Sequence, residues 1–465
     1  MATVPTMITS SWRAHHMRRD VLGWAAFALV LIVALFSARN NAGLEWLWPV
    51  VGVVSVIPLF IAGRAWRLPW WIHAAGAAVP VSVLMVGLTA DGGWFGAARA
   101  TRYGWGLLAA IALMAWATTP KRRIVAASGV IVLALDQYVT AWFPWWGGGD
   151  PARLMTGTFG WHNQLAAYCL IGAAVAMVMA MLANRIVVLL AVLGFALSGA
   201  GIVASGSRST LALLVVVAIV GLALAVFTRG VRGFGRWVVT CALAIGTTFF
   251  MASAFFFPNS SEAAPFDAVV GRGSGASSWV ARLDHWRVAL EMGAEYWLTG
   301  SGLATYGLRS QCFDRQYYTS NPHNEWLLAW SEGGLIMLLP MVALLVGAVM
   351  VAVRSVRPIP GRVRLLADPG RWAALLGLVM ALGHVAFDFD WAYPSLVVIA
   401  GIVAGIAAAP VVSRRPRGTR WHLIALFAAV ALVTASLGGF MLDPLPHESL
   451  QNGDLQGAAA AAPCA

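Results

Sequence analysis

The sequence Ala-Ser-Gly-Ser-Arg-Ser-Thr, residues 204–210, lies between two apolar runs at 186–204 and 209–227. Each run has about the twenty residues that an α-helix needs to cross a bilayer. The segment therefore predicts two membrane-spanning helices that meet at Arg208. A guanidinium is costly near hydrocarbon, and the small Gly and Ser neighbours leave room for an anion such as a phosphate. An alternative is that Arg208 only ends a span and extends its charge to the membrane surface.

The composition of the whole chain indicates an integral membrane protein. Hydrophobic residues make up 60% of the 465 residues and charged residues 11%, whereas soluble domains carry roughly 25% charged residues. We expect an all-α polytopic membrane fold with about 12–13 transmembrane helices. The expected spans lie near 21–38, 45–63, 71–90, 104–119, 124–142, 164–182, 186–204, 209–227, 237–257, 326–353, 371–389, 393–412 and 421–441. The run at 326–353 is long enough to tilt or to kink at Pro340.

The distribution of charge predicts the orientation. Most of the 31 Lys and Arg residues fall in alternate loops, which the positive-inside rule places in the cytoplasm. Nearly all Asp and Glu residues then lie outside or within spans, so we expect the chemistry at the outer face. The net charge of +12 is explained as an orientation signal. We therefore expect the lipid bilayer as a partner and no nucleic acid.

This orientation divides the chain into four parts. Residues 1–257 form an N-terminal bundle of about nine spans, 258–325 a periplasmic loop subdomain, 326–442 the C-terminal spans, and 443–465 an outer-face tail. Within the long loop, Ser278–Trp297 predicts an amphipathic helix, because its apolar residues recur at helical spacing. Such a helix is suited to the membrane surface.

Several motifs in this order resemble the superfamily of O-antigen ligases, O-antigen polymerases and pilin-type O-oligosaccharyltransferases, and O-antigen ligases most of all. They are Gly-Ser-Arg-Ser at a span end, Arg-Leu-Asp-His-Trp-Arg, Leu-Thr-Gly-Ser-Gly-Leu, Pro-His-Asn-Glu-Trp-Leu and Glu-Gly-Gly-Leu, together with Thr-Gly-Thr-Phe-Gly-Trp-His-Asn at 156–163. The resemblance covers roughly 150–400 and implies a GT-C-like fold. It places the chain in the bacterial inner membrane, with the active site at the periplasmic face.

The resemblance also implies a reaction. A glycan on undecaprenyl diphosphate would pass to a hydroxyl acceptor, which is lipid A-core, another glycan or a protein. The family's essential residues correspond to Arg208, Arg282 and His323 in this chain. Two Arg forks suit the diphosphate leaving group, and an imidazole, whose ordinary pKa is about 6.5, suits a general base. The alternatives are a helix surface charge for Arg282 and a helix cap for His323.

Further polar residues are candidates for substrate binding: Arg287, Asn163, Asn324, Arg309 and Asp388. Arg287 and Arg309 could equally be solvated surface charges. His384 and Asp388 are four residues apart at the end of the span 371–389, so we expect them to share a helix face. A metal at Asp388 and Asp390 is the minor alternative to a polar network, so we expect no metal and no cofactor.

Three other functions remain open. A polymerase that joins repeat units and a protein oligosaccharyltransferase would share the donor and most of the mechanism. A transporter of a lipid-linked or anionic substrate is more remote, because no inverted repeat is evident between the halves and the charges gather at one face.

Overall fold

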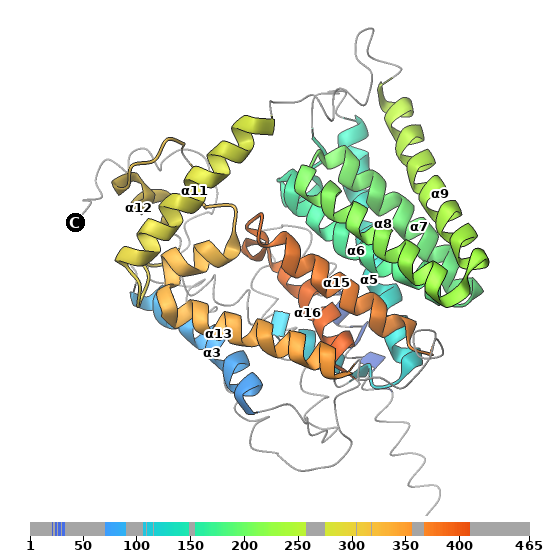
Figure 1. Cartoon of the computed structure of the whole chain (residues 1–465), viewed down its shortest axis with the longest axis horizontal. Coiled ribbons are helices and arrows are strands. Elements are labelled where there is room, and N and C mark those ends of the chain that lie inside the picture. Colours follow the sequence, from blue (N-terminus) through green and yellow to red (C-terminus); the bar gives the residue numbers. More distant parts are fainter. Residues whose placement is uncertain are drawn as a thin grey trace, which may run out of the picture.

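The computed structural model describes residues 70–89, 106–147, 154–256, 275–355 and 367–409, with single positions omitted inside these ranges, and some positions of 21–32. All regular elements in this part of the chain are α or 3₁₀ helices (Figure 1). Six of them are long and apolar enough to cross a membrane. The chain is thus an all-α polytopic membrane protein, as predicted. The expected spans 45–63 and 421–441 and the tail 443–465 lie outside the described residues, and 21–38 and 104–119 are described only in part.

The fold is built around α6, His162–Leu182, in which every residue from Asn163 to Leu182 is buried. Around it pack α5 (Pro120–Gly147), α7 (Arg185–Ser205), α8 (Arg208–Arg229) and α15 (Pro369–His384). The sequence of α6 has six Ala and one Gly, and such small residues let neighbouring helices approach closely, as is usual between helices in membranes. The helix α9 (Val231–Phe256) covers α7 and α8 and exposes Val239, Ile245, Phe249 and Phe250.

The turn between α7 and α8 has the form that its sequence predicts. Gly206 ends α7 in the left-handed conformation, at φ 69°, and its N–H bonds to the carbonyl of Val203. Glycine adopts this conformation without strain. Arg208 is then the first residue of α8. The two predicted spans on either side of Arg208 are confirmed as helices.

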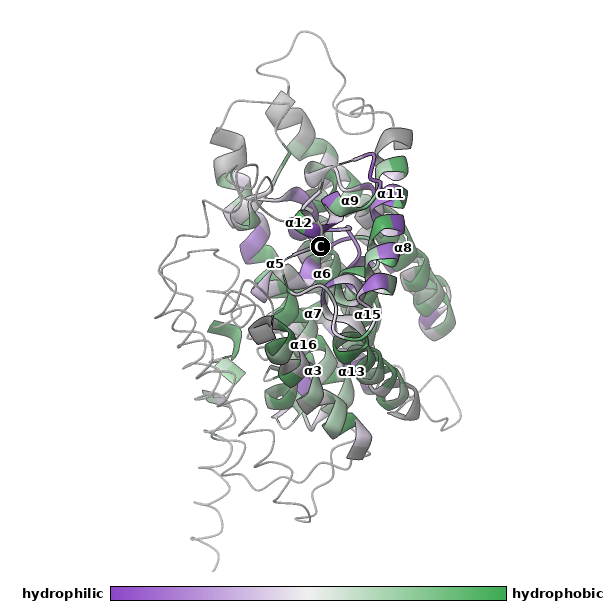
Figure 2. Cartoon of the chain, turned by 90° about the vertical axis from the view of Figure 1, so that its left-hand side faces the viewer, coloured by the Kyte–Doolittle hydropathy of each residue, from purple (hydrophilic) through white to green (hydrophobic). Residues whose placement is uncertain are grey.

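A second group of helices packs beside this bundle. It contains α3 (Trp70–Thr89), α13 (Glu325–Ser355), α11 (Gly275–Glu295) and the short α12 (Tyr306–Arg309). In Figure 2 the hydrophilic residues gather on α11 and α12, while the long helices are largely hydrophobic. The helix predicted at 278–297 is present as α11, and it packs on α13.

The non-helical break in α13 lies at Gly334, which has φ 55° and ψ −157°, and Pro340 lies within the helix after it. The cause is the turn that follows α11, which packs against the break. The N–H groups of Leu335 and Ile336 bond to the carbonyls of Trp297 and Leu298, at 2.9 and 3.2 Å. The N–H groups of Ser301 and Gly302 bond in return to Ser331 and Glu332, both at 3.0 Å. The motifs Leu-Thr-Gly-Ser-Gly-Leu and Glu-Gly-Gly-Leu thus satisfy each other's backbone groups.

The prediction of a helix to residue 389 is wrong, because α15 ends at His384. The carbonyl of Val385 accepts the N–H of Glu325, and the N–H of Phe389 bonds to the side chain of Asp388. These contacts replace the bond that would continue the helix. Residues 385–393 form an irregular connection that includes the 3₁₀ turn η4, Asp390–Ala392, before α16, Pro394–Ala408. His384 and Asp388 therefore share no helix face.

The two ends of the bundle differ in their polar contacts. At one end, Arg229 and Arg236 donate to the last carbonyls of α6. At the same end Arg123 makes a buried, two-pronged ion pair with Asp368, at 2.6 and 2.9 Å. The candidate site residues lie at the opposite end, where α6, α8, α13 and α16 begin and α7 and α15 finish.

Candidate active site

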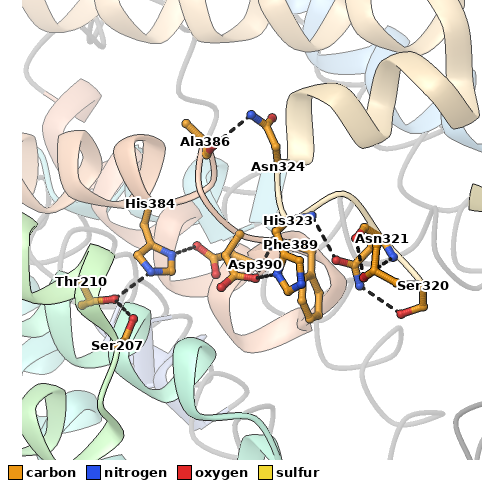
Figure 3. Close-up of polar contacts among 12 residues, drawn as sticks. Ser207, Thr210, Ser320, Asn321, His323, Asn324, His384, Ala386, Phe389 and Asp390 are labelled. Carbon is orange, nitrogen blue, oxygen red and sulfur yellow. Dashed lines mark hydrogen bonds and ion pairs between the residues drawn. The ribbon is translucent and has the colours of Figure 1, made fainter. Parts of the chain in front are cut away.

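The segment before α13 is held against the connection between α15 and α16 (Figure 3). Asn324 acts as the cap of α13, since its Oδ1 accepts the N–H groups of Trp326 and Leu327, at 3.0 and 3.1 Å. Its Nδ2 donates to the carbonyl of Ala386 at 2.9 Å. The side chain expected to bind substrate is thus engaged on both sides by the protein.

His323 is the one non-glycine residue with positive φ in the described part of the chain, at 50°. A side chain in this conformation is strained, and such strain gathers at functional sites. Contacts on both sides hold this conformation. The His323 N–H bonds to Asn321 Oδ1, and the next residue, Asn324, is held by its bond to the carbonyl of Ala386. The positive φ and these contacts therefore fix the direction in which the imidazole leaves the backbone.

Asp388 orients that imidazole. His323 Nδ1 lies 3.2 Å from Asp388 Oδ1, and the side chains of His323 and Asp388 are 19% and 0% exposed. Burial raises the pKa of Asp388, but the hydrogen bond and charge of His323, the charge of His384 and the Phe389 N–H outweigh it, so the pKa is below its ordinary value. An ionised carboxylate accepts Nδ1–H, and this tautomer leaves Nε2 with the lone pair that a base needs.

A second histidine–carboxylate pair lies beside the first. His384 Nδ1 is 2.6 Å from Asp390 Oδ2, and both side chains are buried, at 1% and 4% exposure. His384 Nε2 is 2.8 Å from Thr210 Oγ1, which in turn is 2.8 Å from Ser207 Oγ. The two carboxylates that the sequence placed at one span end thus each hold a different histidine.

The two candidate arginines approach this cluster from different helices. Arg208 is exposed at the start of α8, two residues before Thr210. Arg282 is half-buried on α11, and its charge lies within electrostatic reach of His285 and His384. The pKa of His285 is lowered to about 4, mainly by burial and also by the positive charges of His323, Arg282 and Arg315. The negative charge of Asp284 acts in the opposite direction. Since the His285 and His323 rings are 6.2 Å apart, α11 places a second imidazole beside the candidate base.

Arg287 and Arg309 have partners within the segment 284–314. Arg287 pairs with Asp284 and Glu291, each at 2.9 Å, and donates to the carbonyl of Asp314. Arg309 lies over the ring of Tyr296, with 5.4 Å from its Cζ to the centroid. These contacts stabilise the loop, and a glycan would have to compete with them.

Asn163 is buried in the first turn of α6, two residues after the exposed Trp161. The ring of Trp161 lies 6.5 Å from that of Phe389, which follows Asp388. The motif at 156–163 therefore borders the connection that carries both carboxylates. Among the described residues, no group of three or more His, Cys, Asp and Glu side chains could hold a metal ion.

Residues 193–342 match the family model described as O-antigen ligase. This part of the chain is similar to the domain of O-antigen ligases, and the match supports the O-antigen ligase and polymerase superfamily. The matched region contains Arg208, Arg282 and His323, whereas Asp388 and His384 lie beyond its end. The domain supports glycosyl transfer of the O-antigen ligase or polymerase kind, in a multi-pass membrane protein. A search of curated proteins found no match to the chain.

Sequence reasoning missed three residues of the cluster, although each stands in a quoted motif. Ser207 and Thr210 flank Arg208, and His285 follows Asp284 in Arg-Leu-Asp-His-Trp-Arg. The available signal was a hydroxyl or imidazole beside each candidate arginine. Their partners lie up to 174 positions away along the chain, as for Thr210 and His384, and spacing alone does not reveal such contacts.

Proposed function

We propose that the chain transfers a glycan from undecaprenyl diphosphate to an acceptor hydroxyl at the periplasmic face of the bacterial inner membrane. The acceptor that best fits the O-antigen ligase domain is lipid A-core. The observation that carries this proposal is the strained His323 paired with the buried Asp388, at the same end of the bundle as Arg208 and Arg282.

The proposed step uses each of these groups once. The acceptor hydroxyl gives its proton to Nε2 of His323, and its oxygen attacks the anomeric carbon of the donor. The bond from that carbon to the diphosphate oxygen breaks, and its electron pair stays on the diphosphate. Attack from the side opposite the leaving group inverts the anomeric centre. Arg208 and Arg282 stabilise the charge that grows on the diphosphate, because a guanidinium presents a fixed fork of donors to phosphate.

We also propose that transfer needs no divalent metal. Two guanidinium groups supply positive charge at the leaving group, and Asp388 and Asp390 each give one oxygen to a histidine. Transfer by the purified protein should therefore persist in excess EDTA. Loss of activity in EDTA, with recovery on adding magnesium or manganese, would show that a metal shares the role given to the arginines.

Deleting the gene and separating the cell's lipopolysaccharide, capsule and glycoproteins on gels tests the choice of acceptor. We expect long chains to disappear from lipid A-core. Retention of single repeat units would instead indicate a polymerase, and loss of protein-linked glycan an oligosaccharyltransferase. If all glycans remain, the transferase proposal fails and the transporter alternative has to be tested.

A further inference from the structure

A chain of four buried polar side chains links two turns that are distant in sequence (Figure 3). It runs from Ser207 through Thr210 and His384 to Asp390, with contacts of 2.8, 2.8 and 2.6 Å. The proposed transfer step uses none of the four. Buried polar groups are costly unless they are paired, and a paired network fixes one arrangement of the elements that it joins.

The exposure of the two histidines separates their roles. The side chain of His323 is 19% exposed, so substrate can reach it, whereas that of His384 is 1% exposed. The Nε2 atom of His384 is also already hydrogen-bonded to Oγ1 of Thr210. His384 is therefore not placed to act on a substrate hydroxyl.

The contacts form an unbroken hydrogen-bond chain. Asp390 accepts the Nδ1–H of His384, and Nε2 of the same ring is paired with the hydroxyl of Thr210. The hydroxyl of Thr210 is also paired with that of Ser207. Each of these hydroxyl and ring protons has a partner, and the first turn of α8 is fixed to the connection between α15 and α16.

The same connection carries the partner of the candidate base. Asp388 and Asp390 are separated only by Phe389, and they hold His323 and His384 respectively. A displacement of this connection would move the candidate base and the start of α8 together. The spacing between His323 and Arg208 is thereby set by one short segment.

We propose that Thr210, His384 and Asp390 are positioning residues that hold Arg208 at the correct distance from His323 for glycan transfer. This inference rests on the proposed function of Arg208 as a diphosphate ligand. A positioning error of about 1 Å typically costs on the order of 10²-fold in rate. We call the hydrogen-bond chain from Ser207 to Asp390 the relay. Breaking the relay should therefore reduce transfer without removing any group that touches the substrate.

Thr210→Val is the decisive variant, because it keeps the side-chain shape and removes the hydroxyl. We expect about a 10- to 100-fold loss in kcat/KM for the donor and weaker binding of undecaprenyl diphosphate itself. Thr210→Ser restores the hydroxyl and should recover most of both. Thr228→Val is the matched control on the same helix, since its hydroxyl is also buried but only donates to Leu224 within α8. It should behave as the wild type.

A double-mutant comparison separates positioning from general stability. If the relay acts through Arg208, Thr210→Val should cost little further activity in an Arg208→Lys background. Losses that multiply fully would overturn the inference. Should Thr210→Val fail to insert, Thr210→Ala removes the same hydroxyl with a smaller side chain and must show the same non-additivity.

The outcomes also distinguish the two proposals. A wild-type protein that neither binds undecaprenyl diphosphate nor transfers glycan would overturn the proposed function. A wild type that does both, with Thr210→Val equal to it, would overturn the relay alone.

Discussion

Replacing Asp388 by asparagine should slow glycan transfer by about 10²–10⁴-fold while the protein still inserts in the membrane. The carboxylate is completely buried, and its Oδ1 contacts His323 Nδ1 at 3.2 Å. Asparagine keeps the shape but removes the charge that favours protonation of the ring during transfer. If its amide N–H₂ turns toward Nδ1, the ring proton moves to Nε2 and the base is lost. At 1.36 kcal/mol for each factor of ten, the expected loss corresponds to about 3–5 kcal/mol of transition-state stabilisation.

The assay is single-turnover transfer by protein purified in detergent, with undecaprenyl diphosphate-linked glycan as donor. Asp314→Asn is the control, because it removes the same charge from an exposed residue of the segment between α12 and α13. It should transfer at the wild-type rate. A rate for Asp388→Asn within about threefold of the wild type, far below the 10²–10⁴-fold effect of a base, would refute the orienting role of Asp388.

Three further predictions follow from the geometry. Arg208→Ala and Arg282→Ala should each lose most transfer activity, and Arg208→Lys should be only partly active because it keeps the charge and loses the fork; wild-type transfer by purified Arg208→Ala would exclude a diphosphate contact. Gly300→Ala should lower the thermal unfolding midpoint, because a Cβ at φ 70° would lie 2.2 Å from the backbone of Glu332, and the left-handed conformation alone costs about 1–2 kcal/mol; Gly246→Ala, which meets nothing within 4 Å, is the control, and equal midpoints would contradict the packed turn. The thermal unfolding midpoint should also fall as pH drops from about 6.5 to about 4. The reason is that the folded state lowers the pKa of His285 to about 4, so the unfolded chain takes up the proton first. His285→Gln should make the midpoint depend less on pH, and an unchanged dependence in this variant would exclude His285 as the cause.

The spans near the site could be predicted because their cause is local. An apolar run of about twenty residues needs no partner to be recognised, and the ends at Arg208 and Glu325 carry their own signals in Gly206 and Pro322. The break inside α13 and the end of α15 were not predicted, because a distant segment decides the backbone at each. The loop at 297–302 breaks α13 at Gly334, and the segment before α13 ends α15 at His384.

The site divides in the same way. The roles of Arg208, Arg282 and His323 came from a resemblance in the order of motifs, and they remain proposals. The pairing of His323 with Asp388, and of His384 with Asp390 and Thr210, depends on how four helices meet. Sequence spacing favoured a shared helix face for His384 and Asp388, and the structure replaces that contact with two separate pairs.

The central claim is that His323 is the general base of glycan transfer. Its most direct test compares donor binding and single-turnover transfer for the purified wild type and His323→Ala between pH 5 and 9. We predict a loss in transfer of about 10²–10⁴-fold, donor affinity close to that of the wild type, and a pH–rate curve without its acidic limb. Loss of donor binding, with the remaining chemistry and its pH dependence unchanged, would contradict the claim and make His323 a ligand of the diphosphate headgroup.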